Sequence, residues 1–269
     1  MAESDKVFAG SIPELYDRLL VPLIFEPYAR DLAERVAQTS PSRVLETAAG
    51  TGVVTRALAA RLPAHATITA SDLNQPMLDR AATRLRDDRI AWRQADALAL
   101  PFADQGFDAV ACQFGVMFFP DKGRGYAEAR RVLKPQGRFL FNVWGAIADN
   151  EFADLVTEAV AGLFPADPPR FLARTPHGYH DVKQIRADLA AAGFASSTVE
   201  TVDAVSRAAS PRDVAVAFCQ GTPLRNDIET RAAARLEEAT QAAADALARR
   251  YGSGPLEGRI RAHVITAVR

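Results

Sequence analysis

The sequence is poor in the features that mark several classes of protein. It has two cysteines, Cys112 in an apolar stretch and Cys219 in a predicted helix, and their positions fit neither a disulfide framework nor a metal-binding spacing. No apolar run is long enough to span a bilayer. The N-terminal residues MAESDKVFAG lack the basic and then apolar segments of a signal peptide. We therefore expect a cytoplasmic protein with no bound metal and no membrane insertion.

The chain also lacks an excess of charge of either sign. Its formal net charge is −1 and its sequence pI is about 6.4. Nucleic-acid-binding domains carry basic patches, so this balance predicts no nucleic-acid partner. Hydrophobic residues make up 48% of the 269 residues, enough for one large domain or one domain with an elaborate cap.

Between residues 43 and 144, short apolar strands alternate with amphipathic helices. This alternation predicts an α/β fold, with a parallel sheet covered by helices on both faces. Breakers at Pro135 and Gly137 end the last of these helices, and Pro76 is expected as the first residue of another. The predicted strands cover residues 43–47, 66–72, 89–96, 107–114 and 137–144.

The flanking segments are less regular. Residues 11–38 are predicted to be helical in two pieces, broken around Pro22 and Pro27. Beyond the fifth strand, further strands are expected over 197–206 and near the C-terminus. Between them we predict an inserted helical pair, one helix capped by Ser210 and one starting at Asn226 with Glu229 completing a capping box.

The stretch VLETAAGTG, residues 44–52, reads as a buried strand that ends in Glu46 and leads into a turn of small residues. A helix that begins directly after a strand presents unpaired backbone N–H groups to a ligand. Gly50 and Gly52 supply the freedom in φ that such a turn requires. The same pattern also occurs in dinucleotide sites and in turns that only pack tightly, so this motif alone leaves the ligand open.

Two more acids end the next predicted strands. Asp72 follows Gly50 by 22 positions, the spacing at which an acid accepts ribose hydroxyls in nucleotide-binding folds, although it also fits a helix cap. Asp96 closes the third strand and, with the Ala97 N–H, suits an adenine edge; alone it fits a surface loop equally well. Ligands of open parallel sheets bind at the carboxyl ends of the strands, which is where Glu46, Asp72 and Asp96 are expected.

Four stretches resemble successive motifs of the Rossmann-like S-adenosylmethionine-dependent methyltransferases. The resemblance covers roughly residues 40–145 and is closest to the branch of the ubiquinone/menaquinone-biosynthesis methyltransferases. It implies a seven-stranded sheet with the last strand antiparallel, an N-terminal helical lid and a helical insertion before the last strand. The stretches are VLETAAGTG, SDLNQPML, ADALALPFADQGFDAVACQFGVMFFPD and RVLKPQGRFLFNVW.

The resemblance further implies one methyltransferase domain over residues 1–269. Residues 1–40 would form the lid, 41–145 the cofactor-binding core, and 146–269 the remaining strands with a substrate-side helical cap.

The same resemblance assigns a cofactor role to individual positions. Glu46 stands where aspartate is more frequent, and Ala48 where glycine is more frequent; we expect a negative φ at Ala48, because an alanine avoids the left-handed region. The implied contacts are Glu46 to the methionine amino group, the backbone of Ala48 and Gly50 to the methionine moiety, Gly52 in the same turn, Asp72 to the ribose, Leu73 and Met77 to the adenine, Asp96 and Ala97 to the adenine edge, and Gln113 at the junction with the acceptor.

Large apolar residues follow the fourth strand and predict an apolar acceptor site, although core packing explains such residues as readily. They are Phe114, Met117, Phe118 and Phe119. An Asn-Pro-Pro-Tyr-like tetrad, which would favour amino methylation of nucleic acid or protein, is missing there.

Candidate bases lie elsewhere in the chain. His177 and His180 are possible proton acceptors near neutral pH, although loop histidines are more often structural. Tyr179 lies between them, and Tyr16 resembles a tyrosine of the family's N-terminal lid.

We therefore predict methyl transfer from S-adenosylmethionine to a small apolar or aromatic molecule, which would be quinone-like, polyketide-like or lipid-derived. Such a transfer depends mainly on positioning, with a base needed only where the nucleophile carries a proton. One alternative is an NAD-linked oxidoreductase, against which the missing third glycine counts. Another is a non-catalytic regulatory subunit that binds the cofactor, since fold does not settle function. The acceptor atom and the oligomeric state are left open.

Overall fold

The structure is a computed structural model that describes residues 12–269. The chain forms two compact units, each assembled from three separate segments. Unit 1 comprises Met1–Phe25, Trp144–Gly178 and Asp203–Arg261, and unit 2 comprises Glu26–Val143, Tyr179–Val202 and Ala262–Arg269. No helix among the described residues is long and apolar enough to cross a membrane.

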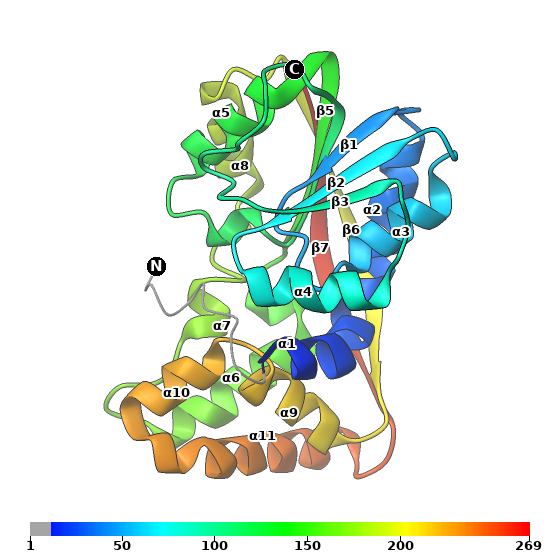
Figure 1. Cartoon of the computed structure of the whole chain (residues 1–269). Coiled ribbons are helices and arrows are strands. Elements are labelled where there is room, and N and C mark those ends of the chain that lie inside the picture. Colours follow the sequence, from blue (N-terminus) through cyan, green and yellow to red (C-terminus); the bar gives the residue numbers. More distant parts are fainter. Residues whose placement is uncertain (1–11) are drawn as a thin grey trace. The chain divides into compact units, whose positions relative to one another are not determined.

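Helices and strands mostly alternate between residues 26 and 144, and runs of consecutive helices follow (Figure 1). The strands are β1 (Arg43–Glu46), β2 (Thr67–Asp72), β3 (Ile90–Gln94), β4 (Phe107–Gln113), β5 (Leu133–Trp144), β6 (Ser196–Ala208) and β7 (Leu256–Val268). The helices are α1 (Ile12–Leu15), η2 (Tyr16–Phe25), α2 (Glu26–Ala37), α3 (Val53–Arg61), α4 (Gln75–Arg84), η3 (Val116–Phe118), α5 (Lys122–Val132), η4 (Ile147–Asp149), α6 (Glu151–Leu163), α7 (Phe171–Arg174), α8 (Val182–Ala191), α9 (Pro211–Gln220), α10 (Leu224–Ala232), η5 (Ala233–Arg235) and α11 (Leu236–Tyr251).

The strands form one seven-stranded sheet in the order β3-β2-β1-β4-β5-β7-β6. The pairs β1–β2, β1–β4, β2–β3 and β4–β5 are parallel. Strand β7 runs antiparallel to β5, because the Arg269 N–H donates to the Gly137 carbonyl while the Gly145 N–H donates to the Arg261 carbonyl. The predicted mixed sheet, with its last strand antiparallel, is therefore confirmed.

One face of the sheet in unit 2 is covered by α2 and α3. A cluster of small and aliphatic side chains fills this layer, including Leu32 from α2, Leu58 from α3 and Leu140 from β5, all at most 1% exposed. Apolar residues at helical spacing on both helices explain why they bury one face each.

The opposite face of β5 carries aromatic residues. Successive side chains of a strand point to opposite faces, so Phe139 and Phe141 lie on the other side from Leu140. Their ring centroids are 4.7 Å apart, and Tyr126 of α5 and Phe194 lie within 6.0 Å of Phe139. Helix α5 therefore lies on this second face and α8 packs against α5, as the predicted helix–sheet–helix layering requires.

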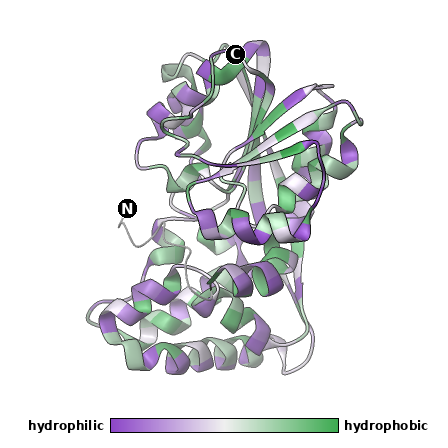
Figure 2. Ribbon diagram, viewed as in Figure 1, coloured by the Kyte–Doolittle hydropathy of each residue, from purple (hydrophilic) through white to green (hydrophobic). Residues whose placement is uncertain are grey.

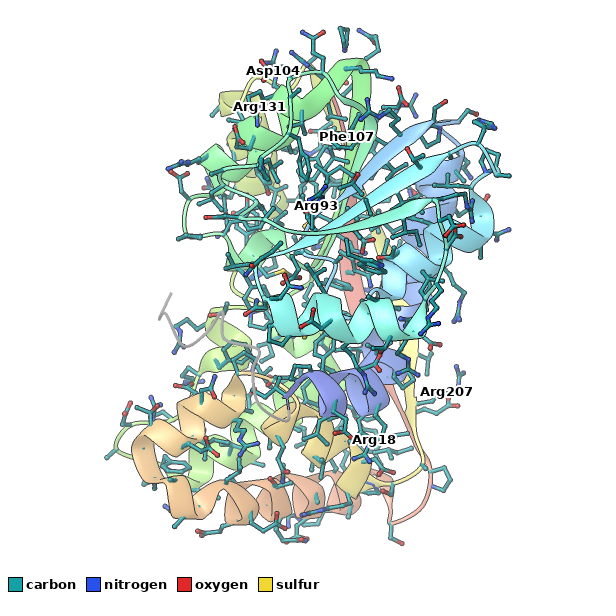
Figure 3. The ribbon with its side chains drawn as sticks, in the orientation of Figure 1. Arg18, Arg93, Asp104, Phe107, Arg131 and Arg207 are labelled. Carbon is teal, nitrogen blue, oxygen red and sulfur yellow. The ribbon has the colours of Figure 1, made fainter. Side chains whose placement is uncertain are left out.

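The loop between β3 and β4 is fixed by an arginine side chain of α5. Arg131 of α5 donates to Asp104 at 2.6 Å and to the carbonyls of Phe102 and Leu100 at 2.8 and 2.9 Å (Figure 3). These bonds hold the loop between β3 and β4 against α5.

Unit 1 is mainly helical. The alanine-rich helix α11 buries one side, and its ribbon alternates between purple and green along its length, as expected of an amphipathic helix (Figure 2). Phe152 of α6 and Tyr251 of α11 pack edge to face with centroids 5.4 Å apart. The Ser206 hydroxyl donates to the Leu23 carbonyl at 2.7 Å and ties β6 to η2.

Three predictions for the flanking segments need correction. Residues 12–37 are helical without a break, because the backbone passes through a π-helix, η2, that contains Pro22. Helix α10 begins at Leu224, and Glu229 pairs with Arg225 at 2.8 Å instead of capping at Asn226. Three α-helices, α9, α10 and α11, lie between β6 and β7 where a pair was predicted. The Ser210 cap is confirmed, since its hydroxyl accepts the Asp213 N–H.

Candidate cofactor site

Glu46 is the last residue of β1 and its side chain is completely inside the protein, with 1% exposure. The hydroxyl of Thr55, in the first turn of α3, donates to the Glu46 Oε2 at 2.6 Å. Burial raises the pKa of Glu46 to about 8, the Thr55 bond opposes this rise, and the nearby Asp72 carboxylate adds to it. Burial thus favours the protonated form of Glu46 when no cation is bound beside it.

Asp72 ends the neighbouring strand β2 and is also buried. Its Oδ2 accepts the Gly50 N–H at 2.8 Å, and its Oδ1 accepts the Asn74 N–H at 2.8 Å. Burial raises the pKa of Asp72, while these backbone donors lower it. Each carboxylate oxygen has a second lone pair, so further donors can still bind.

These two carboxyl groups have no counter-ion in the described part of the chain. Neither Glu46 nor Asp72 forms a salt bridge with any residue from 12 to 269. The nearby Arg56 donates through Nη1 to the Thr51 carbonyl at 2.9 Å instead, and its charge only partly lowers the pKa of Glu46. A buried carboxyl group ionises readily only beside a positive charge, so this pair favours a positively charged ligand.

The turn after β1 is left-handed at three positions. Gly50 and Gly52 have φ of 55° and 78°, as predicted, but Ala48 has φ of 53°, so the expected negative φ at Ala48 is wrong. Both neighbours of Ala48 bond to adjacent strands: the Thr47 N–H donates to the Ala111 carbonyl and the Ala49 N–H to the Ser71 carbonyl. These bonds to β4 and β2 determine the local backbone path.

A glycine in the loop after β4 makes room for the Ala48 methyl group. A Cβ on Gly115, after β4, would lie 2.5 Å from the Ala48 Cβ and 2.7 Å from the Cys112 Sγ. The Ala48 methyl group therefore occupies space that a side chain at position 115 would need.

The rest of the turn is close to α4 and β3. A Cβ on Gly52 would lie 3.1 Å from both Ala81 and Trp92, so glycine lets α3 start against these side chains. A Cβ on Gly50 would meet the Met77 Cε at 3.7 Å, so Gly50 and Met77 are neighbours in the structure. The Thr51 hydroxyl is buried and has no hydrogen-bond partner among residues 12–269, so this turn holds an unsatisfied polar group.

The predicted adenine contacts lie at the ends of β2 and β3. Leu73 is 46% exposed, which is unusual for a large apolar side chain next to a buried strand, and the Gln94 side chain donates to its carbonyl at 2.9 Å. Strand β3 ends at Gln94, so Asp96 does not close the strand but lies two residues beyond it. Asp96 is exposed and accepts the Leu98 N–H at 2.9 Å, and Ala97 is partly buried beside it.

The residues after β4 are held in an unusual backbone conformation. Phe114 has a φ of 49°, and its N–H lies 3.2 Å from the Asn142 carbonyl and 2.9 Å from the Asn142 Oδ1. Asn142 also donates to the Gln113 Oε1 at 3.4 Å, and Phe114 packs edge to face on Tyr28. Left-handed non-glycine residues often occur at functional sites.

The apolar candidates differ in exposure. Phe114, Met117 and Phe119 are at most 7% exposed, so in this structure they pack inside unit 2, while Phe118 is partly exposed. Core packing, the alternative left open by the sequence, therefore describes three of the four.

The remaining candidates are divided between the units. Tyr16 and His177 belong to unit 1, and Tyr179 and His180 to unit 2. Tyr16 stacks on Phe25 with centroids 5.1 Å apart. His180 is exposed.

His177 is 5% exposed and lies 5.9 Å from the Trp144 ring. Its Nδ1 is 2.9 Å from the Gly145 carbonyl, which can only accept, so Nδ1 carries the proton and Nε2 is the basic nitrogen of the neutral ring.

Three polar residues were not predicted as site residues from the sequence. Thr55 bonds to Glu46, Asn142 bonds to Phe114, and Lys122 bonds to the carbonyl of Phe119. Asn142 had a signal that was overlooked, since it is a polar residue within the otherwise apolar run FLFNVW. Thr55 became relevant only when α3 was placed against β1.

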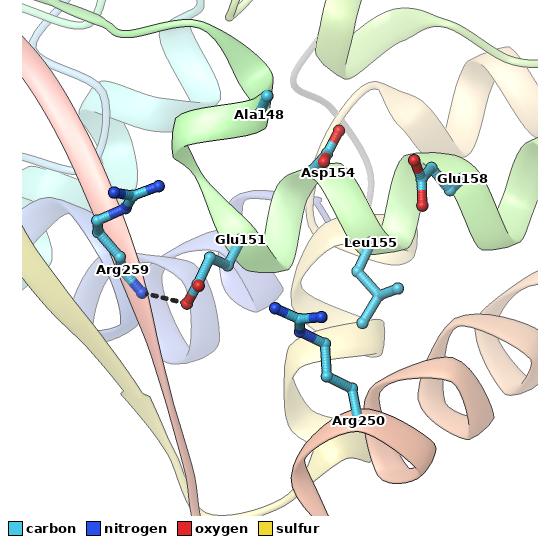
Figure 4. Close-up of a pocket in the computed structure, with 7 residues that line it drawn as sticks. All are labelled: Ala148, Glu151, Asp154, Leu155, Glu158, Arg250 and Arg259. Atoms are coloured by element: carbon cyan, nitrogen blue, oxygen red, sulfur yellow. Dashed lines mark hydrogen bonds between the residues drawn. The ribbon is translucent and has the colours of Figure 1, made fainter.

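A hollow of about 270 Å³ lies on unit 1 (Figure 4). Its lining is mostly charged, and the Glu151 carboxylate in it accepts the Arg259 N–H at 2.7 Å. It is lined by Ala148, Glu151, Asp154, Leu155, Glu158, Arg250 and Arg259. None of the residues predicted from the sequence lies there.

Comparison with known proteins identifies the family. A model described as a methyltransferase domain matches residues 45–141, which include the whole turn and the ends of β1, β2 and β4. The chain is 36% identical over 171 residues to a demethylmenaquinone methyltransferase from Clavibacter sepedonicus, covering 60% of this chain and 69% of that protein. The chain belongs to the S-adenosylmethionine-dependent methyltransferases.

Other members of this methyltransferase family differ in substrate. The chain is 36% identical over 166 residues to a malonyl-[acyl-carrier protein] O-methyltransferase from Geobacter sulfurreducens, covering 61% of this chain and 60% of that protein. It spans between 56% and 69% of the length of the first three curated relatives that it matches.

The solved structure of the YcgJ protein from Bacillus subtilis has the same fold. Its TM-score with this methyltransferase family member is 0.57 at 18% identity, covering 90% of this chain and 98% of that one.

Proposed function

We propose that this protein transfers a methyl group from S-adenosylmethionine to a small apolar or aromatic molecule. The observation that carries the proposal is the buried pair Glu46 and Asp72, which has no counter-ion within residues 12–269 and ends two adjacent parallel strands. A ligand that carries an ammonium group, ribose hydroxyls and an adenine suits this pair and the backbone N–H groups beside it.

Bound S-adenosylmethionine would supply an electrophilic methyl group on a sulfonium. Asp72 would accept ribose hydroxyls through the lone pairs that the Gly50 and Asn74 N–H groups leave available. Glu46 would release its proton and orient the cationic amino group, because a nearby positive charge lowers the pKa of a buried carboxyl. Leu73 and Met77 would lie against the adenine, and Asp96 with Ala97 at its edge.

The acceptor side is inferred from a residue that follows β4 and from the relatives. Phe118 is a partly exposed aromatic side chain, which supports an apolar or aromatic acceptor. A demethylated quinone is the substrate that the name of the Clavibacter sepedonicus relative gives, and quinone-like, polyketide-like and lipid-derived acceptors all fit. Tyr16 and Tyr179 are proposed substrate-side residues, and His177 and His180 are proposed bases for acceptors that must lose a proton.

The single methyltransferase domain with a helical lid and cap, and the cytoplasmic location, stay predictions from the sequence. For the two alternatives, an NAD-linked oxidoreductase and a regulatory subunit, no specific contact in the described residues provides support.

Cofactor binding is the first test. Isothermal titration calorimetry with S-adenosylhomocysteine should give micromolar binding to the wild-type protein and none with NAD. Asp72→Asn should weaken this binding by about tenfold or more, because hydrogen bonds to a charged group are worth about 1.5–3 kcal/mol. Asp88→Asn, at an exposed acid after α4, serves as the matched control and should bind normally. Wild-type affinity in Asp72→Asn would contradict the ribose assignment, and binding of NAD alone would overturn the proposal.

Turnover is the second test, and it separates an enzyme from a regulatory subunit. Methyl-labelled S-adenosylmethionine should transfer label to hydroquinones or hydroxylated naphthoates in the presence of the protein. Tight binding of S-adenosylhomocysteine without transfer to any aromatic acceptor or to a metabolite extract would favour the regulatory subunit.

A further inference from the structure

Lys122 is a half-buried lysine of unit 2. It is the first residue of α5 and follows the segment that contains Met117 and Phe118. Its Nζ donates to the Phe119 carbonyl at 3.1 Å and lies 4.7 Å from the centroid of the Tyr179 ring. Burial lowers the pKa of Lys122, and the charge of Asp188 only partly offsets that effect.

No carboxylate pairs with Lys122 in the described part of the chain. Asp188 is the carboxylate whose charge raises the pKa of Lys122. Its two oxygens accept hydrogen bonds from the Tyr179 hydroxyl at 2.5 Å and the Gln184 amide at 2.7 Å. By contrast Lys134, another of the four lysines in the chain, bonds to Asp108 at 2.6 Å. An ammonium group has three N–H donors. One donor of Lys122 bonds to a neutral carbonyl, that of Phe119.

The ring beneath Lys122 is held firmly. Tyr126 donates from its hydroxyl to the Tyr179 hydroxyl at 3.3 Å, and Tyr179 donates to Asp188. Burial raises the pKa of both tyrosines, so both phenols stay neutral and cannot serve as the counter-ion of Lys122. The hydrogen bonds from Tyr126 to Tyr179 and from Tyr179 to Asp188 thus hold the Tyr179 ring against the Lys122 ammonium group, and none of the three side chains forms an ion pair with it.

We propose that Lys122 binds an anionic oxygen attached to an aromatic ring of the acceptor. A carboxylate or an ionised hydroxyl there would complete the hydrogen bonds of the ammonium group, and the ring would lie against the aromatic side chains Phe118 and Tyr179. This inference rests on the proposed methyl transfer, and it narrows the acceptor to acidic aromatic molecules. A neutral lipid-derived acceptor would offer Lys122 no anionic partner.

The test compares two probes of the same shape on protein saturated with S-adenosylhomocysteine. By calorimetry, 1-hydroxy-2-naphthoate should bind the wild-type protein at least tenfold more tightly than the neutral 1-hydroxy-2-naphthamide. Lys122→Met should abolish this preference and leave amide binding unchanged, while Lys122→Arg should keep most of it. Lys183→Met, at an exposed lysine of α8, is the control and should behave as wild type.

Several outcomes would overturn the inference. One is equal affinity of the wild-type protein for both probes, and another is failure of the naphthoate to bind at millimolar concentration. The third is an equal loss of affinity for both probes in Lys122→Met, which would indicate a structural role. The wild-type comparison decides the question even if Lys122→Met does not fold. Failure of the methyltransferase proposal is distinguishable, because it would appear as a wild-type protein that does not bind S-adenosylhomocysteine.

Discussion

At the scale of single residues, Glu46 shows how position alone changes chemistry. The residue ends a buried strand, and its ordinary pKa of 4.5 rises to about 8 because burial disfavours the charged form. The folded protein therefore holds a proton between about pH 4.5 and 8 that the unfolded chain releases. Stability follows the difference in bound protons, so the contribution of Glu46 is fully present below about pH 4.5 and is lost as pH rises through about 8.

Glu46→Gln should remove this dependence, because glutamine keeps an acceptor for Thr55 and never ionises. Urea unfolding of the cofactor-free proteins between pH 5 and 8 should show the variant gaining on wild type by up to about 1.4 kcal/mol per pH unit. Glu158→Gln, at an exposed residue of α6, should run parallel to wild type. A constant difference between Glu46→Gln and wild type across this range would show that Glu46 is ionised in the folded protein.

Ala48 shows that a residue can be forced into a conformation its side chain disfavours. A left-handed L-residue costs about 1–2 kcal/mol relative to a right-handed one, whereas glycine occupies this region without that cost. The bonds of Thr47 and Ala49 to the adjacent strands offset the strain at Ala48.

Ala48→Gly should therefore leave the stability unchanged or raise it by up to about 1 kcal/mol, after the extra entropy lost by glycine. Ala49→Gly, at the adjacent buried alanine without a positive φ, should lower it by about 1 kcal/mol. Chemical denaturation of both variants measures the difference. Equal losses in the two would show that Ala48 is not strained.

At the scale of elements, helix α5 is shaped by two glycines with different surroundings. A Cβ on Gly125 would lie 2.5 Å from the Phe119 ring, so this glycine lets Phe119 lie directly on the helix. A Cβ on Gly123, two residues earlier, would only make an ordinary contact at 3.5 Å with Asp121. The packing of Phe119 against α5 thus depends on one missing methyl group.

Glycine-to-alanine changes in helices normally stabilise by up to about 1 kcal/mol, and Gly123→Ala should follow this rule. Gly125→Ala should instead destabilise by about 1–3 kcal/mol, because the methyl group displaces Phe119. Thermal unfolding of the two variants compares them directly. A gain in stability for both would mean that Phe119 moves aside freely.

At the scale of the whole molecule, the last strand in the sequence is an interior strand of the sheet. Strand β7 lies between β5 and β6, and its residues contribute to both compact units. Neither unit is a continuous segment, so the chain must be nearly complete before its sheet can form. This arrangement also leaves β5 as an exposed edge until β7 is in place.

Deletion of residues 256–269 should therefore abolish cooperative folding and make the protein aggregate. Soluble yield and a far-ultraviolet circular dichroism melt measure these effects. A soluble truncated protein with one sharp transition would contradict the central role of β7.

The sequence alone determined the features that depend on near neighbours. The apolar period fixed the strands, so Glu46 and Asp72 were correctly placed at the ends of β1 and β2, and the Ser210 cap followed from residues within one turn. The order of the motifs also identified the methyltransferase fold.

The tertiary structure alone decided the features that depend on contacts between distant segments. The left-handed Ala48 is set by bonds to β2 and β4 and by the missing side chain at Gly115, and no local pattern contains that information. The raised pKa of Glu46, and the lack of a carboxylate bonded to Lys122 within residues 12–269, likewise depend on which groups surround them after folding. Local propensity specifies elements because it acts through neighbouring residues, whereas strain, burial and charge pairing arise only when packing brings distant residues together.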